Sequence, residues 1–311
     1  MKKTAILFSG QGAQAVGMGK DLYEVSPIAR RLFDGAETLF KGITDICFNG
    51  HPEMLKSTEY AQPCLFLTGL AFALELKNRG IAADCAAGFS LGEIPALAYS
   101  GVMTESDAFS FVLKRARKMA ELSRIHSGSM IAALKLDAET VESLCAEFKE
   151  TWPVNYNCPG QISCSGRPDE IDSLAAKIVS NGGRAVKLAV SGAFHTPYMA
   201  PAEEVLREAL EDIDIKAPAI PLYADLTGEK YPCSREEIID TVSKQVCSPV
   251  RFENILKNMA RDGVDTFIEV GAGSTLTGFV KRTLPEAVHY TVTDVGSLME
   301  ATELIVGGEA A

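Results

Sequence analysis

Residues 87–93 read AGFSLGE, and this stretch decides how the rest of the sequence is interpreted. The small residues of 83–89 are typical of a buried strand, and a helical pattern follows Ser90. Between Gly88 and Gly92 the spacing fits G-x-S-x-G, in which a nucleophilic serine sits on a tight strand-to-helix turn. The alternative is a serine that caps an ordinary helix, since so short a motif arises by chance in many chains. The strand before Ser90 and the helix after it favour the nucleophile.

Composition excludes several classes of function. The chain has 311 residues, of which 47% are hydrophobic, and a net charge of −11, so nucleic acid is not expected as its main partner. The eight cysteines include no CxxC pair and have no histidine cluster beside them, so a zinc site is not expected either. The longest apolar run, CLFLTGLAFALEL, contains Glu75 and is too short to span a bilayer. With scattered thiols and no signal peptide evident at its start, the chain is expected to be cytoplasmic, without membrane attachment.

Strand and helix patterns alternate along most of the chain, which predicts an α/β fold with a parallel sheet covered on both faces. Strands are expected at 4–9, 83–89 and 264–270, and helices at about 27–41, 60–79, 105–123, 197–213 and 234–262. The middle of the chain differs, because its patterns follow the order βαββαβ of a ferredoxin-like unit. We therefore predict a main domain formed by 1–125 and 194–311, with an inserted ferredoxin-like subdomain at 126–193.

A nucleophilic serine needs a base, and the chain offers four histidines. His195 lies in SGAFHTPYM, where the subdomain returns to the main domain, and clefts often form at such junctions. The other three, His51, His126 and His289, lie in loops or before a late strand. A single histidine is more often a surface or core residue than a catalytic one, so only its position favours His195.

Arg115 carries an independent signal. Helical spacing places it in the same stripe as Ala108, Phe111 and Met119, whereas Arg117 falls on the polar face. A buried arginine is costly unless it meets an anion. The stripe therefore leaves three interpretations open: a structural salt bridge, a side chain that extends to solvent, or a partner for a substrate carboxylate.

Two glycine-rich segments argue against a nucleotide cofactor. SGQGAQ at 9–14 and VGAGSTLTG at 270–278 both lack the G-x-G-x-x-G spacing, and neither is followed by Lys-Ser/Thr. Such turns still present convergent backbone N–H groups, which is what an oxyanion hole requires.

Six motifs occur in one order between Thr4 and about Thr293: LFSGQGAQ, AGFSLGE, KRARKMAE, VNYNCPGQISCSG, SGAFHTPYM and EVGAGSTLTGFVKR. Together they resemble the malonyl-CoA:acyl carrier protein transacylase family. The resemblance implies an α/β-hydrolase-like main domain and a transferase that moves malonyl from coenzyme A to the phosphopantetheine thiol of acyl carrier protein. It implies ping-pong chemistry in fatty-acid or polyketide synthesis, with no cofactor besides the substrates.

The resemblance also implies roles for single residues. Ser90 matches the family's nucleophile, His195 its base, and Arg115 the arginine that binds the malonyl carboxylate. Gln11 and Leu91 match the residues whose backbone N–H groups form the oxyanion hole.

Two further glutamines match residues around the family's pocket. Gln245 matches the residue whose main-chain carbonyl orients the histidine, and Gln62 a glutamine near the substrate. Phe89 departs from the family, which often carries histidine before the serine, so the pocket beside Ser90 is expected to differ.

Three other functions fit part of the same pattern. A serine acyl hydrolase of similar core fold would release free acid, a non-catalytic scaffold would only bind the carrier, and a trans-acting polyketide acyltransferase would share the chemistry. Arg115 and the inserted subdomain disfavour the hydrolase, and an intact set of catalytic residue types disfavours the scaffold. No apolar helix face is left unassigned, so a monomer is expected.

Overall fold

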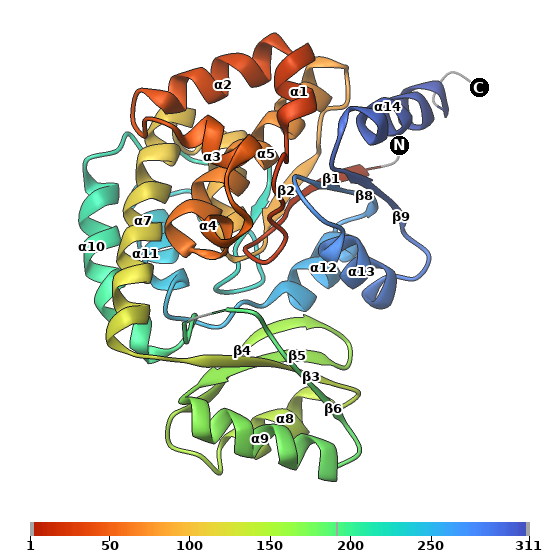
Figure 1. Ribbon diagram of the computed structural model, residues 1–311. Helices are drawn as coiled ribbons and strands as arrows, with labels where there is room; N and C mark the ends of the chain where they lie inside the picture. Colours follow the sequence, from red (N-terminus) through yellow and green to blue (C-terminus); the bar gives the residue numbers. More distant parts are fainter. Residues whose placement is uncertain (1–2, 191, 309–311) are drawn as a thin grey trace.

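The computed structural model describes residues 3–190 and 192–308, and these form two parts joined side by side (Figure 1). The larger part contains a five-stranded parallel sheet with the order β7-β2-β1-β8-β9. Its strands are β1 (Lys3–Phe8), β2 (Cys85–Gly88), β7 (Leu222–Tyr223), β8 (Val264–Val270) and β9 (Val288–Val292). The predicted α/β fold with a parallel sheet is therefore confirmed.

The central strand β1 explains why helices cover both faces of this sheet. Successive side chains of a strand point to opposite faces, and Ile6 and Phe8 enter one hydrophobic core while Ala5 and Leu7 enter another. The first core is filled largely by α5 and the helices around it, and the second by α12 and α13. Both faces are thus buried, as a parallel sheet requires.

Helices supply most of the remaining mass of the larger part. They are α1 (Lys20–Val25), α2 (Pro27–Glu37), α3 (Ile43–Asn49), α4 (Pro52–Lys56), α5 (Thr58–Asn78), α6 (Glu93–Tyr99), α7 (Glu105–Ile125), α10 (Ala200–Glu211), α11 (Arg235–Gln245), α12 (Phe252–Arg261), α13 (Thr275–Thr283) and α14 (Val295–Gly308), with 3-10 turns η1 (Ser90–Gly92) and η2 (Pro197–Met199). Within residues 3–190 and 192–308, no helix combines the length and apolar character needed to cross a membrane.

The smaller part is a four-stranded antiparallel sheet with the order β4-β5-β3-β6, and two helices cover one of its faces (Figure 1). Along the chain its elements are β3 (Ser129–Leu134), α8 (Ala138–Cys145), β4 (Thr151–Cys158), β5 (Gln161–Gly166), α9 (Pro168–Ser180) and β6 (Arg184–Lys187). Ile131 and Ile162 point toward these helices, and Met130 and Ser163 point toward the larger part. The two parts also meet through a bridge between Asn155 and Val250.

In the C-terminal third the structure divides one predicted helix and adds another. The single helix expected at 234–262 is two helices, α11 and α12, separated at residues 246–251. Pro249 lies in this break, where it has no N–H to continue a helix. The helix α14 at Val295–Gly308 was not predicted.

The sheet brings three strand ends to one edge. Phe8 is in register with Gly88 on one side and with Val270 on the other. The turns that follow these strands therefore lie together, and the turn after β2 carries Ser90. In open parallel sheets this carboxyl edge is where ligands bind.

Gly92→Ala should destabilise the fold strongly, because a Cβ at this position would lie 2.1 Å from the carbonyl oxygen of Phe8. Overpacking of this kind costs about 1–3 kcal/mol or more. The matched control is Gly35→Ala on the exposed side of α2, where a Cβ meets nothing within 4 Å. That change should stabilise by about 0.5–1 kcal/mol. Urea denaturation followed by circular dichroism measures both, and a Gly92→Ala protein as stable as wild type would contradict the packing argument.

Candidate active site

Ser90 stands on a turn that has no space for neighbouring side chains. Its φ of 53° lies in the left-handed region, which is uncommon for residues other than glycine. A Cβ on Gly88 would lie 1.9 Å from the carbonyl carbon of Gly92, so the chain can close this turn only with glycine there. The turn projects the Ser90 side chain from the carboxyl edge of the sheet into the space between the two parts of the molecule.

His195 meets Ser90 in this space. Its Nε2 lies 2.7 Å from the Ser90 Oγ, and its Nδ1 lies 3.0 Å from the carbonyl oxygens of both Gln245 and Ser248. A carbonyl oxygen can only accept, so Nδ1 carries the hydrogen and Nε2 has a free lone pair for the serine proton. The histidine is thus oriented by two main-chain carbonyls.

The break between α11 and α12 explains why these carbonyls are available. The last carbonyls of a helix lack intrahelical partners, and Gln245 is the last residue of α11. Ser248 follows in the short segment before Pro249. Sequence reasoning named Gln245 but missed Ser248, although Pro249 signalled the end of a helix there.

Burial sets the protonation state of His195. His195 is 3% exposed, and burial together with the charge of Arg115 lowers its pKa to about 4, against the opposing effect of the two carbonyls. The ring is therefore neutral near pH 7, which is the state that can take a proton from Ser90.

Arg115 lies directly beside Ser90. Its side chain is 1% exposed, and its guanidinium donates to the Oε1 atoms of Gln62 at 2.9 Å and of Gln245 at 3.0 Å. Nη2 also lies 3.4 Å from the Ser90 Oγ. Burial lowers the pKa of Arg115 to about 10, with Glu93 and Asp225 opposing this effect, so the group stays charged.

The direct contacts of Arg115 are unusual for a buried cation. Across residues 3–190 and 192–308 no salt bridge includes Arg115, and its side-chain partners are neutral amide and hydroxyl oxygens. A buried charge normally finds an ionic partner. The site therefore has a buried cation next to Ser90 that has no direct ionic partner among the described residues.

Gln62 links Arg115 to the loop after β1. Its Nε2 lies 3.4 Å from the Oε1 of Gln11, whose own Nε2 donates to Thr58 Oγ1 at 3.2 Å. The hydrogen bonds found among the described residues include none from the backbone N–H groups of Gln11 or Leu91. Leu91 is the second residue of η1, and the first N–H groups of a helix have no acceptor within it. Both N–H groups are therefore free donors in this part of the chain.

Two buried carboxyl groups lie behind Ser90, and sequence reasoning missed both. Asp225 Oδ2 accepts the backbone N–H of Ser90 at 2.6 Å, and Glu93 Oε1 accepts the N–H of Asp225 at 3.0 Å. Burial raises the pKa of Glu93 to about 7 and that of Asp225 well above its usual range. Asp225 follows β7 at the carboxyl edge of the sheet, and this position would have drawn attention to it had the two-residue strand been recognised.

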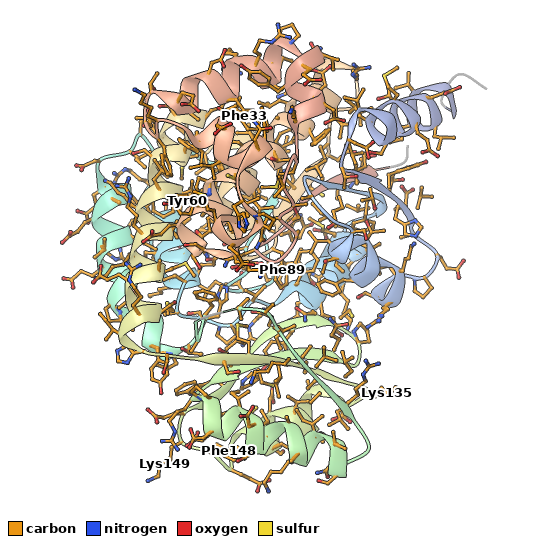
Figure 2. All side chains as sticks on the ribbon, viewed as in Figure 1. Phe33, Tyr60, Phe89, Lys135, Phe148 and Lys149 are labelled. Carbon is orange, nitrogen blue, oxygen red and sulfur yellow. The ribbon has the colours of Figure 1, made fainter. Side chains whose placement is uncertain are left out.

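A cavity of about 260 Å³ lies between the two parts and opens onto Ser90 and His195. The larger part contributes residues of the loop after β1 and of helix α13. The smaller part contributes Asn155 and Asn157, among others. Phe89 forms part of its wall and packs against Phe252 with ring centroids 5.4 Å apart. Figure 2 places Phe89 near the junction of the two parts, whereas Phe148 and Lys149 lie at the far end of the smaller part.

Comparisons with known proteins agree on one family. Residues 6–304 match the family described as acyl transferase domain. The malonyl CoA-acyl carrier protein transacylase of Bacillus subtilis is 40% identical over 289 residues, which cover 91% of this chain and 90% of the relative.

Solved structures give the same result. The crystal structure of malonyl CoA-acyl carrier protein transacylase from Clostridium perfringens matches with a TM-score of 0.94 at 34% identity, covering 99% of this chain and 98% of that one. A type II PKS acyl-carrier protein in complex with its malonyl-transacylase has a chain that matches with a TM-score of 0.93 at 30% identity, covering 97% and 99%.

The reactivity of Ser90 should stay high in mildly acid solution. Because the pKa of His195 is lowered to about 4, the neutral base is fully present above about pH 5 and is lost as pH falls through 4. We expect the rate at which a fluorophosphonate labels Ser90, measured from pH 3.5 to 8, to stay constant down to about pH 5. The rate should then fall to half near pH 4, rather than near the pH of 6.5 expected for an ordinary histidine.

Glu93→Gln serves as the control. It removes the Glu93 carboxyl group, whose pKa is raised to about 7, and keeps a side-chain oxygen that can accept the Tyr231 hydroxyl. The fall in rate at low pH should not move in this variant, which assigns the fall to His195. Half-maximal labelling near pH 6.5 in the wild type would show that His195 is solvated and would contradict the structure.

Proposed function

The chain belongs to the acyl transferase family, among the malonyl-CoA:acyl carrier protein transacylases, and we propose that it carries the malonyl group as an ester on Ser90. The observation that carries this proposal is the 2.7 Å contact between Ser90 Oγ and the Nε2 of a neutral, carbonyl-anchored His195. Such a pair is the arrangement by which an enzyme activates a serine nucleophile.

In the first half-reaction, Ser90 Oγ attacks the carbonyl carbon of malonyl-CoA while His195 Nε2 takes the hydroxyl proton. The tetrahedral oxyanion is held by the free backbone N–H groups of Gln11 and Leu91. The carbon–sulfur bond then breaks, and His195 returns the proton to the departing thiolate of coenzyme A. The product is a malonyl ester on Ser90.

In the second half-reaction, the phosphopantetheine thiol of the carrier protein attacks the ester. His195 takes the thiol proton, the carbon–oxygen bond to Ser90 breaks, and the serine oxygen recovers the proton from His195. Both half-reactions use the same base and the same oxyanion donors. The acceptor can therefore bind only after coenzyme A has left, which is ping-pong kinetics.

Arg115 would hold the free carboxylate of the malonyl group. The guanidinium now contacts the neutral oxygens of Gln62 and Gln245. A carboxylate in place of one of them would add the opposite charge and could accept two parallel N–H groups, which makes a stronger pair than a hydrogen bond to an amide oxygen. The exchange therefore favours malonyl over acetyl, which has no carboxylate.

The cavity has features that suit a phosphopantetheine arm. Asn155 and Asn157 line it and place polar side-chain amides among its apolar groups. A phosphopantetheine arm has two amide groups, and a few polar side chains of this kind can orient such a ligand. Apolar groups such as Met130 and Leu188 line other parts of the cavity and fit the arm's methylene segments.

The proposal also covers the fold class of each part, the cellular compartment and the oligomeric state. We assign the larger part, 1–125 and 194–311, to the α/β-hydrolase-like class, and 126–193 to the ferredoxin-like class. The order β4-β5-β3-β6 of an antiparallel βαββαβ unit supports the second assignment. The enzyme is proposed to act as a cytoplasmic monomer that needs acyl carrier protein, malonyl-CoA and no further cofactor.

Incubation with malonyl-CoA alone should add one malonyl group to the peptide that contains Ser90, detected by intact-protein and peptide mass spectrometry. Addition of phosphopantetheinylated carrier protein should move this group to the carrier thiol. Ser90→Ala should abolish the adduct, because the nucleophile is absent. His195→Ala should slow its formation by about two to four decades, as loss of a general base does.

The same experiment separates the alternatives. Release of free malonate without a malonylated carrier would identify a hydrolase. An unmodified protein and carrier would identify a binding scaffold. An adduct that persists in Ser90→Ala would remove Ser90 from the mechanism.

Arg115→Ala should lower kcat/KM for malonyl transfer by roughly two to four decades, since loss of one partner of a buried ion pair costs about 3–5 kcal/mol. Acetyl transfer should hold or rise, because acetyl-CoA makes no such contact. Arg117→Ala on the exposed face of α7 is the control and should change neither strongly. Equal losses for malonyl and acetyl in Arg115→Ala would show that the arginine is structural.

A further inference from the structure

We infer that Asp225 is a positioning residue, whose Oδ2 fixes the backbone of Ser90 and, through Gln245, the orientation of Arg115. This inference rests on the proposed function and extends it to a residue outside the direct chemistry. Asp225 lies 135 residues from Ser90 in sequence and is fully buried.

The first contact concerns the strained turn. Ser90 has a left-handed backbone, which other residue types adopt only when the surroundings enforce it. Its N–H donates to Asp225 Oδ2 at 2.6 Å, and its carbonyl oxygen accepts from Gln245 Nε2 at 2.6 Å. Both polar backbone groups of the nucleophile are therefore held by this pair of side chains. The Ser90 N–H is directed at Asp225, which leaves the oxyanion to other donors.

The second contact decides which way the Gln245 amide faces. Its Nε2 donates to Asp225 Oδ2 at 3.0 Å, and its Oε1 accepts from Arg115 at 3.0 Å. A flipped amide would set its oxygen against the Asp225 carboxyl group and its N–H groups against the guanidinium. Asp225 thereby makes Gln245 present an acceptor to Arg115.

Asp225 is itself fixed from the other side. Its N–H donates to Glu93 Oε1 at 3.0 Å, and the same oxygen accepts the Tyr231 hydroxyl at 2.7 Å. This chain of contacts leads from Tyr231 through Glu93 and Asp225 to the nucleophile. Tyr231, Glu93 and Asp225 are all buried, so solvent does not compete for the hydrogen bonds between them.

The two contacts made by the Asp225 side chain use one oxygen. Oδ2 accepts from both Ser90 and Gln245, whereas Oδ1 has no partner among the described residues. An asparagine could place its amide oxygen at the Oδ2 position and accept the same two hydrogen bonds. The role therefore needs an acceptor and not a charge, which separates Asp225→Asn from variants that lack any acceptor.

The test compares Asp225→Asn with Asp225→Leu and the smaller Asp225→Ala, all in the full chain. The first readout is the second-order rate of Ser90 labelling by a fluorophosphonate, which needs no acyl donor. The second is the ratio of kcat/KM for malonyl-CoA to that for acetyl-CoA. Glu170→Leu is the matched control, because Glu170 is a buried carboxyl group that accepts the Glu150 N–H in the smaller part.

Asp225→Asn should label within about threefold of wild type with an unchanged ratio. Asp225→Leu and Asp225→Ala should label about ten- to a hundredfold more slowly, as expected when a buried donor loses its acceptor. Their malonyl-to-acetyl ratio should fall as well, because Gln245 no longer holds Arg115. Glu170→Leu should keep both the labelling rate and the ratio.

Wild-type labelling rates in both acceptor-free variants would overturn the inference. The inference would also be overturned if the malonyl-to-acetyl ratio stayed unchanged and Glu170→Leu lost as much labelling rate as the Asp225 variants. That result would mean a loss of stability alone. Equal losses in Asp225→Asn and Asp225→Leu would show that charge, and not an acceptor, matters. If the wild type forms no malonyl adduct, the proposed function fails, while the labelling rates still decide the role of Asp225.

Discussion

The backbone conformation of Ser90 is the constraint around which the site is built. A residue with a side chain seldom holds a left-handed turn, and this one is closed by glycines whose neighbours leave no room for a Cβ. Its cost is offset by packing against β1 and by the hydrogen bonds of Ser90 to Asp225 and Gln245. The result is a serine oxygen with a fixed position, so His195 and Arg115 can be placed relative to it.

Charge in this site is arranged by burial. Arg115 raises the cost of a second positive charge at His195, and the lowered pKa keeps the histidine neutral. Glu93 and Asp225 act on Arg115 from behind and without direct salt bridges among the described residues. The guanidinium is thereby stabilised as a cation, yet its hydrogen bonds go to groups that a carboxylate can replace.

Local patterns predicted those parts of the site that a short stretch of chain encodes. The turn at Ser90 and the stripe that contains Arg115 could be read directly, and the resemblance to the transacylase family is confirmed by the comparisons. Asp225 and Glu93 could not be found in this way, because the contact between them spans 132 residues and depends on a two-residue strand. Pro249 is a signal for the break between α11 and α12 that the predicted helix at 234–262 does not take into account, and Ser248, whose carbonyl orients His195, lies in that break.

The two parts of the molecule contribute different things to the site, so substitutions in each part have different consequences. The smaller part has a hydrophobic core of its own between β3, β5 and its two helices. It supplies one wall of the cavity, while Ser90, His195 and Arg115 all come from outside residues 126–193. Descendants of this sequence can therefore alter the wall, and with it the fit to a different carrier or acyl donor, without disturbing the reacting groups. Substitutions in the inserted segment can in this sense change specificity independently of Ser90, His195 and Arg115.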